Sequence, residues 1–407
     1  MKEKLKSYYG ANFQTISNEV VRILTDLVKE KTVNVPKKDL SKYSYLEVPG
    51  QESKAAAVVT RELDKIGIKY KVHEQQKGRA NVLGYYGDGP TSLLVGAHMD
   101  VVPPGDGWSS DPFTTYVKDG LIYGRGVIDN KGPLAATIVA LKILKEQGVE
   151  LKGSLIMGAI ASEEFREPGE MDPGLEYLMK NNLLKPTYAI IPDIGENMKK
   201  IDIAEKGRLQ MTVTSYGKQA HGSTPERGVN AVIMMGHYLT KLQNLNMKFK
   251  HHHYLVKPSL NVGIIQGGSA SNIVPAECEV TLDIRFLPGQ TPEGIVEELK
   301  EISKNVEGKF EFKIQTYTLP HEVDPDNILV KALQKNSQDI LGQKAEPFGM
   351  GGGTFAKGFN LAGITAVGFG PGDDNAFHIA NEYIEIRQLV QFAQLISATA
   401  IDILGTK

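Results

Sequence analysis

Apolar residues recur with helical spacing in some segments of the chain and with strand spacing in others. Residues 14–31 and 51–66 each place their apolar positions on one stripe, which predicts two amphipathic helices. The short apolar runs 91–102, 154–164 and 187–193 are typical of buried strands, and helical patterns separate them. Strands that alternate with helices predict an α/β fold with a mostly parallel central sheet.

The pattern changes near residue 207. From there the expected order is strand, helix, strand, strand, helix, strand, which is the ferredoxin-like α+β arrangement. The α/β pattern then resumes and ends in a helix over 386–404. We therefore expect one domain formed by residues 1–207 and 319–407, with a second domain, residues 208–318, inserted into it.

The composition is that of an ordinary globular protein, with 41% hydrophobic residues and 23% charged residues. The formal net charge is only −2, so no overall field attracts nucleic acid or an anionic membrane, and neither is expected as a partner. The chain shows neither a transmembrane apolar run nor the apolar region of a secretory signal. A cytoplasmic location is the simplest expectation.

The chain has one cysteine, Cys278, and nine histidines. One cysteine cannot form an internal disulfide, and it excludes cysteine-rich zinc sites. Any metal ion here would therefore be held by histidines and carboxylates.

Polar side chains gather where the predicted buried strands end. His98 and Asp100 end one strand with a spacing of two, which puts both side chains on one face. Glu163 and Glu164 end the next strand, and Asp193 ends a third. Ligands bind outside the carboxyl ends of strands in open α/β sheets, so these positions are candidates for a site.

Two further candidates lie in loops. Asp129 follows a glycine-rich turn in GRGVIDNKGP, and His378 precedes the last helix. Each candidate also has a structural explanation: a helix N-cap for Asp129, a solvated loop for a Glu-Glu pair, and a structural role for a single histidine. Two histidines with several carboxylates and no cysteine together favour a hydrolytic zinc site.

With these residues in place, the sequence resembles the di-zinc exopeptidase and deacylase family. That family includes acetylornithine deacetylase, succinyl-diaminopimelate desuccinylase, glutamate carboxypeptidase and cytosolic dipeptidases. The resemblance spans nearly the whole chain, and the matching segments in order are GAHMDVVP (96–103), YGRGVIDNKGP (123–133), ASEE (161–164), EKG (205–207), GKQAHGSTPERGVNA (217–231), NIVPAECEVTLDIR (272–285), GGGTFAK (351–357) and HIANEYI (378–384).

The resemblance implies two divalent metal ions, with Zn²⁺ expected first and Co²⁺ or Mn²⁺ as alternatives. It implies that the carboxylate of Asp129 bridges the two ions. The remaining ligands would be His98 and Asp193 for one ion, and Glu164 and His378 for the other. Glu196 follows Asp193 by three residues and is an alternative ligand, because the deacetylases and desuccinylases typically carry Glu in this segment.

The resemblance also implies roles for the residues around the ions. Glu163 would be the general base that takes a proton from water and passes it to the leaving nitrogen. Asp100 would orient the site from behind. The peptide bond between Asp129 and Asn130 would be cis.

In the inserted domain, the resemblance implies that His221 stabilises the oxyanion and reaches over from a partner subunit in dimeric members. Asn272 and Arg285 would hold a substrate carboxylate. Gly352 and Gly353, together with Thr354, would present backbone N–H groups to the substrate.

These roles imply a catalytic metallopeptidase domain and an inserted lid and dimerisation domain. The lid lacks the extra segment of monomeric dipeptidases, so a homodimer through the lids is expected. The expected substrate is a dipeptide or similar short peptide, since Asp193 is more typical of dipeptidases and aminopeptidases. An N-acyl amino acid is the alternative substrate, and a non-catalytic binding protein that retains the fold is the alternative of another class.

Overall fold

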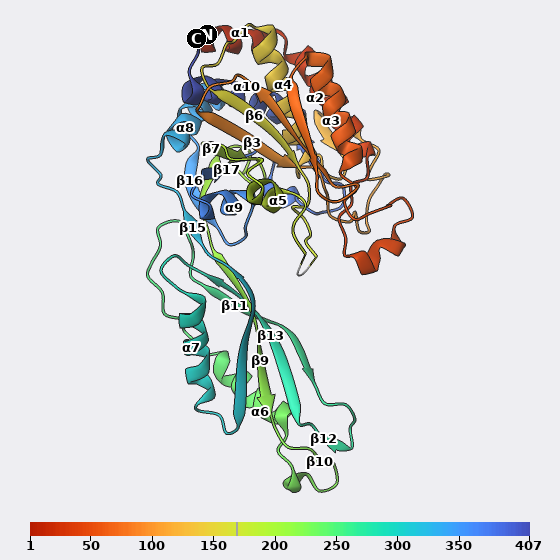
Figure 1. Ribbon diagram of the computed structural model, residues 1–407, viewed down its shortest axis with the longest axis vertical. Helices are drawn as coiled ribbons and strands as arrows, with labels where there is room; N and C mark the ends of the chain where they lie inside the picture. Colours follow the sequence, from red (N-terminus) through yellow and green to blue (C-terminus); the bar gives the residue numbers. More distant parts are fainter. Residues whose placement is uncertain (168–169) are drawn as a thin grey trace. The chain divides into compact units, whose positions relative to one another are not determined.

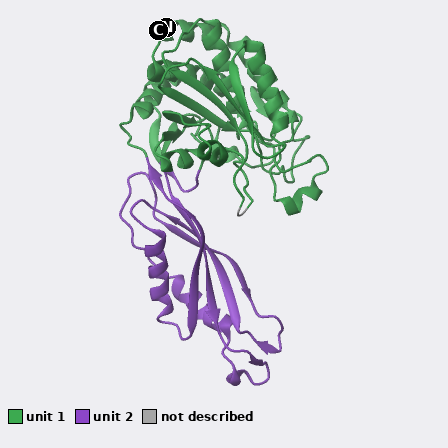
Figure 2. Cartoon of the chain, in the orientation of Figure 1, with its two compact units in different colours: residues 1–203, 323–348, 354–407 green, residues 204–322, 349–353 purple. Residues whose placement is uncertain are grey.

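The computed structural model describes residues 1–167 and 170–407, and these form two compact units (Figure 2). The second unit contains the predicted inserted domain, residues 208–318. It also includes a short glycine-rich loop from later in the chain, Gly349–Gly353. Unit 1 consists of Met1–Ile203, Val323–Phe348 and Thr354–Lys407, and unit 2 of Ala204–Glu322 and Gly349–Gly353.

The central sheet has a parallel middle and antiparallel margins. Its strand order is β1-β2-β6-β3-β7-β17-β8-β15, and β16 pairs with β8. The neighbours β6 and β3, β3 and β7, and β7 and β17 are parallel. The predicted α/β class is therefore confirmed. The strands are β1 (Lys69–Glu74), β2 (Ala80–Tyr86), β3 (Ser92–His98), β6 (Ser154–Ile160), β7 (Tyr188–Ile191), β8 (Lys200–Glu205), β15 (His321–Glu322), β16 (Glu346–Met350) and β17 (Thr365–Gly368).

Helices pack on this sheet and bury its apolar strands. Helix α10 packs against α2, α4 and α8, and α9 packs against β7 and β17 (Figure 1). The N-terminal helix α1, which the apolar pattern did not predict, buries only Leu5 and Tyr9, so its stripe is too narrow to read from sequence. The helices are α1 (Lys2–Ala11), α2 (Phe13–Lys29), α3 (Ser53–Ile66), α4 (Lys131–Glu146), α5 (Leu175–Lys180), α8 (Ile328–Leu341), α9 (Phe355–Leu361) and α10 (Ile386–Leu404).

Short elements complete unit 1. A three-stranded sheet has the order β18-β5-β4, with β4 (Tyr116–Lys118), β5 (Leu121–Tyr123) and β18 (Tyr383–Glu385). Three-residue strands are too short to show a periodic pattern, so the sequence did not indicate this sheet. No helix in the described parts of the chain is long and apolar enough to cross a membrane.

Unit 2 has the predicted strand-helix-strand-strand-helix-strand order. Its antiparallel sheet has the order β11-β13-β9-β14, and α6 and α7 pack against it (Figure 1). Alternate residues of β13 are buried, including Cys278, which belongs to the apolar core as expected of a small core residue. The elements are β9 (Gly207–Tyr216), α6 (Ala231–Leu242), β11 (Ser259–Gly267), β13 (Glu277–Phe286), α7 (Pro292–Ser303) and β14 (Lys309–Thr318), with a small pair β10 (Ala220–His221) and β12 (Ile273–Val274).

Candidate metal centre and active site

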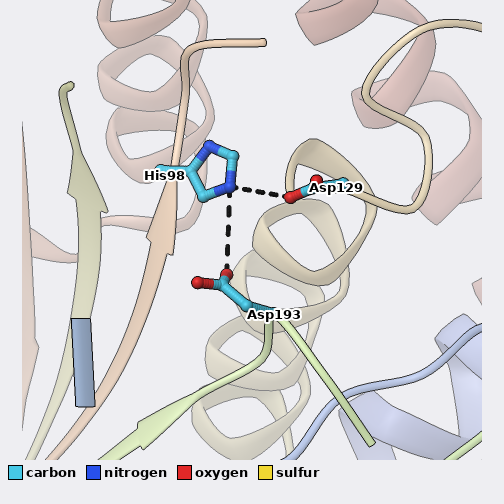
Figure 3. A group of neighbouring side chains, drawn as sticks. All are labelled: His98, Asp129 and Asp193. Atoms are coloured by element: carbon cyan, nitrogen blue, oxygen red, sulfur yellow. Dashed lines mark hydrogen bonds and ion pairs between the residues drawn. The ribbon is translucent and has the colours of Figure 1, made fainter. Parts of the chain in front are cut away.

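A first group of ligand-type side chains lies where two parallel strands end. Strands β3 and β7 are neighbours, so His98 at the end of β3 and Asp193 just after β7 meet at one edge. The Nε2 atom of His98 lies 2.8 Å from Oδ1 of Asp129 and 3.9 Å from Oδ1 of Asp193 (Figure 3). The ligand atoms of these three residues all lie within 4.8 Å of one another.

A second group shares Asp129 with the first. The Nε2 atom of His378 lies 3.0 Å from Oδ2 of Asp129 and 3.3 Å from the carboxylate of Glu164. Asp129 therefore offers Oδ1 to the first group and Oδ2 to the second. Nitrogen and carboxylate oxygen donors in two adjoining groups with one shared carboxylate fit two divalent ions of the zinc type.

The turn before α4 presents the Asp129 side chain. Gly126 has φ of 89°, and a Cβ at this position would lie 2.7 Å from Cγ1 of Val101, so the turn requires glycine. The peptide bond between Asp129 and Asn130 is cis, as the resemblance implies. Asn130 is the N-cap residue of α4, so Asp129 does not have the alternative role of capping this helix.

Asp100 connects the first group to the turn that carries Glu163 and Glu164. Its buried carboxylate accepts hydrogen bonds from the backbone N–H of Glu163 at 3.1 Å and of Glu164 at 3.0 Å. The Nδ1 atom of His98 lies 2.9 Å from the backbone oxygen of Asp100. Asp100 is therefore placed to orient both the histidine and the two glutamates.

The carboxylates of the site influence one another strongly. Burial and the nearby charge of Asp193 raise the pKa of Glu163 well above its usual value. Burial and Asp129 raise the pKa of Glu164 to about 7. Hydrogen bonds with Asp129 and Glu164 raise the pKa of His378 to about 10. Crowded negative charge of this kind favours binding of a cation, which relieves the repulsion.

The structure distinguishes the two candidate ligands Asp193 and Glu196. Glu196 is exposed, its backbone N–H donates to Asp374, and it belongs to neither group of ligand-type side chains. Asp193 belongs to the first group and accepts a hydrogen bond from the Asn130 side chain. The geometry therefore favours Asp193 as the ligand.

His221 and Asn272 lie near each other within unit 2. His221 is exposed on β10, and its Nδ1 atom lies 2.7 Å from the Ser223 hydroxyl. The backbone oxygen of Asn272 accepts a hydrogen bond from Gly222 at 2.7 Å. The two residues predicted to act on the substrate thus share one loop cluster.

Arg285 and the glycine-rich loop are also brought together in unit 2. The Nε–H of Arg285 donates to Asp283 at 2.7 Å, and Arg208 binds the other oxygen of that carboxylate at 2.8 Å. The Nη1 atom of Arg285 lies 3.5 Å from the backbone oxygen of Gly351, next to Gly352 and Gly353. Two guanidinium groups share one carboxylate, so the side chains of Arg208, Arg285 and Asp283 form a face with a net positive charge.

Thr354 has a structural contact that the sequence did not indicate. It begins the last part of unit 1, where its hydroxyl accepts a hydrogen bond from Ala356 and caps α9. Its expected role at a substrate therefore stays a prediction beside this capping role.

Sequence reasoning missed a buried ion pair that ties the loops of the site together. Arg125 and Glu382 pair at 2.7 Å, and Glu382 also accepts hydrogen bonds from the backbone N–H of Gly126 and Ile128. Arg125 contacts the backbone oxygen of His378 at 3.4 Å. Both charged residues lie in segments that carry the resemblance, so their position within those segments was the available signal.

Comparisons with known proteins identify the family of the chain. The chain is 28% identical to an uncharacterized metallohydrolase of Methanocaldococcus jannaschii, over 93% of this chain and 97% of the relative. Aminopeptidase PepT from Bacillus cereus has a similar fold, with a TM-score of 0.73 and 21% identity over 95% of this chain and 98% of its own. Human carnosine dipeptidase 1 is similar at a TM-score of 0.70 and 19% identity, over 99% of this chain and 98% of its own. The model of peptidase family M20/M25/M40 matches residues 94–402, more than half of the chain. The chain therefore belongs to peptidase family M20/M25/M40 and is a metallohydrolase.

Proposed function

We propose that this protein is a two-metal exopeptidase that cleaves the amide bond of a dipeptide or similar short peptide next to a free carboxylate. The observation that carries the proposal is Asp129, whose two carboxylate oxygens belong to two adjoining groups of ligand-type side chains. A shared carboxylate of this kind suits a pair of ions at a hydrolytic site.

In this proposal His98 and Asp193 would hold one ion, Glu164 and His378 would hold the other, and Asp129 would serve both. Zn²⁺ fits this set of donors best, and Co²⁺ or Mn²⁺ would also fit. When bound, such ions polarise a carbonyl group and lower the pKa of a water molecule.

Glu163 supplies the proton transfer. It lies next to the ligand Glu164 but belongs to neither ligand group, so its carboxylate is left for proton transfer. It takes a proton from the attacking water and delivers it to the leaving nitrogen. Asp100 holds the Glu163 side chain in this direction by accepting a hydrogen bond from the Glu163 backbone N–H.

Residues of unit 2, together with Thr354 of unit 1, hold the substrate in this proposal. Arg285 and Asn272 bind the substrate carboxylate, and the positive face that Arg285 shares with Arg208 supports that role. His221 stabilises the tetrahedral oxyanion. The backbone N–H groups of Gly352, Gly353 and Thr354 donate hydrogen bonds to the substrate.

A substrate panel tests the proposal. The Zn²⁺-loaded protein is expected to hydrolyse unmodified dipeptides with a kcat/KM at least about tenfold above that for N-acetyl and N-succinyl amino acids, because its site resembles that of the dipeptidases. Amidated dipeptides, which lack the free carboxylate, are the control and should be poor substrates. A preference for N-acetylornithine would establish the deacylase alternative, and no hydrolysis of any amide would favour the non-catalytic alternative.

We also propose a homodimer formed through unit 2. Strand β11 is an edge strand, and Val262, Ile264 and Ile265 on it are exposed apolar side chains. Helix α6 exposes Val232 and Ile233. An unpaired edge with exposed β-branched residues is a favourable surface for pairing with a second chain.

Light scattering with size-exclusion chromatography tests the dimer. Ile264→Glu should shift the protein from dimer toward monomer, because it places a charge in an apolar interface at a cost of about 2–5 kcal/mol. Ile328→Glu, which changes an equally exposed isoleucine of unit 1, should leave the dimer intact. A monomeric wild-type protein, or an Ile264→Glu variant that stays dimeric, would contradict this interface.

A further inference from the structure

The turn that carries Glu163 and Glu164 is held by side chains from three separate segments. The backbone N–H groups of residues 161–164 donate in order to the side chains of Asn81, Glu52 and, for the last two, Asp100, at 2.9, 3.1, 3.1 and 3.0 Å. Four successive backbone donors of one short turn therefore all bind side chains. Such a turn has little freedom to change the direction of its carboxylates.

Glu52 is fixed in turn by Arg79. The Nε and Nη2 atoms of Arg79 donate to the two carboxylate oxygens of Glu52 at 2.5 and 2.6 Å. Glu52 is fully buried, and Arg79 is only 5% exposed. A bidentate pair of this kind defines both position and plane of the carboxylate, more than a single hydrogen bond does.

The hydrogen bond that Glu52 accepts comes from Ser162, the residue of the turn with a positive φ. Ser162 has φ of 64°, which is uncommon for a residue other than glycine. Its N–H is the group that Glu52 binds. The next two residues carry adjacent carboxylates that repel each other, so an anchor on the backbone just before them limits their movement.

We propose that Glu52, held by Arg79, is a positioning residue that sets the directions of Glu163 and Glu164 through the N–H of Ser162. The inference rests on the proposed function, in which one glutamate moves a proton and the other binds metal. Glu52 belongs to neither group of ligand-type side chains found among the described residues. Arg79 provides the counter-charge without which the buried carboxylate would be costly.

The decisive variants remove the anchor without leaving a buried charge unpaired. Glu52→Met with Arg79→Met deletes both charges and the acceptor for the Ser162 N–H. Glu52→Gln with Arg79→Met deletes both charges but keeps an oxygen that can accept from Ser162. Arg79→Lys is a milder change that keeps the charge and loses the bidentate geometry.

A second buried glutamate offers a matched control. Arg22 binds both carboxylate oxygens of Glu62, at 3.1 and 2.6 Å, and this pair joins α2 to α3. Neither residue belongs to the groups of ligand-type side chains found among the described residues. Glu62 also pairs with Arg61 and Lys65. Arg22→Met with Glu62→Met, and Arg22→Lys, therefore report the effect of weakening an ion-pair network away from the candidate ligands. Melting temperatures of all variants measure the purely structural cost.

Two readouts distinguish positioning from structure: kcat and KM on the best dipeptide, and the visible absorption spectrum of the full-length protein loaded with Co²⁺. The Met-Met variant at residues 52 and 79 should lose about 10- to 100-fold in kcat with KM changed less than about threefold, and its Co²⁺ bands should shift. The Gln-Met variant should recover kcat to within about fivefold of wild type. Arg79→Lys should lose about three- to tenfold, and the controls should keep wild-type kcat and spectrum.

Unchanged kcat and an unchanged Co²⁺ spectrum in both the Met-Met and the Arg79→Lys variants would overturn the positioning role. Arg79→Lys decides the matter if the Met-Met variant does not fold. The spectrum reports ligand geometry without turnover, so it tests the positioning role even if no amide proves to be a substrate. Lack of activity in the wild-type protein would instead count against the proposed function.

Discussion

Replacing Glu163 with Gln is expected to lower kcat by about 10³- to 10⁴-fold while both metal ions remain bound. The amide has nearly the size and shape of the carboxylate but cannot accept the proton of the attacking water. Metal binding should persist because Glu163 belongs to neither group of ligand-type side chains. Steady-state kinetics on a dipeptide, together with metal analysis by mass spectrometry, measure both effects on the same sample.

Glu170→Gln is the control for this variant. Glu170 lies seven positions further along the chain, is exposed, and pairs with Lys37 at 2.5 Å, so its loss should leave kcat unchanged. A Glu163→Gln variant with wild-type kcat would remove the residue from the role of general base. A variant that loses metal together with activity would instead make Glu163 a ligand.

Replacing Asp129 with Ala is expected to remove both metal ions and to reduce turnover to background, a loss of at least about 10³-fold. The reason is that Asp129 is the one residue common to both groups, with Oδ1 near His98 and Oδ2 near His378. Metal content after dialysis against a fixed concentration of free Zn²⁺ should fall from about two ions per chain to about zero.

Variants of residues that belong to only one of the two ligand groups test the proposed ligand set further. Asp193→Ala and His378→Ala each change a residue of only one group, so each should retain about one ion per chain. Glu196→Ala is the matched control, because this exposed acid lies three residues from Asp193 and should retain both ions. Two ions in Asp129→Ala, or loss of an ion in Glu196→Ala, would contradict the proposed ligand set.

Much of the fold could be predicted because each element carries its own periodicity. The stripe of α2 and the alternation along β13 both result from one face being buried, and such patterns are local in sequence. The short strands β4, β5 and β18 escaped prediction because three residues hold no period. The attachment of Gly349–Gly353 to unit 2 escaped it because the contact joins segments far apart in the chain.

The pairing within the buried ion pairs could not be predicted from local pattern. Arg79 and Glu52, like Arg125 and Glu382, are charged residues of a type that is usually solvated, and nothing local marks them as buried partners. Each pair joins residues from distant segments. Their burial follows from how the segments pack, and so does their contact with the turns that carry the candidate ligands.

The sequence by itself determined the α/β class, the inserted α+β segment and the residue types available for a metal centre, because side-chain period and composition are properties of the chain alone. Only the tertiary structure decided which acids gather. Asp193 and Glu196 both follow β7, yet only Asp193 is grouped with His98, since β3 and β7 are parallel neighbours and Glu196, three residues further on, is exposed. The choice between two nearby carboxylates depends on strand adjacency, which no local pattern contains.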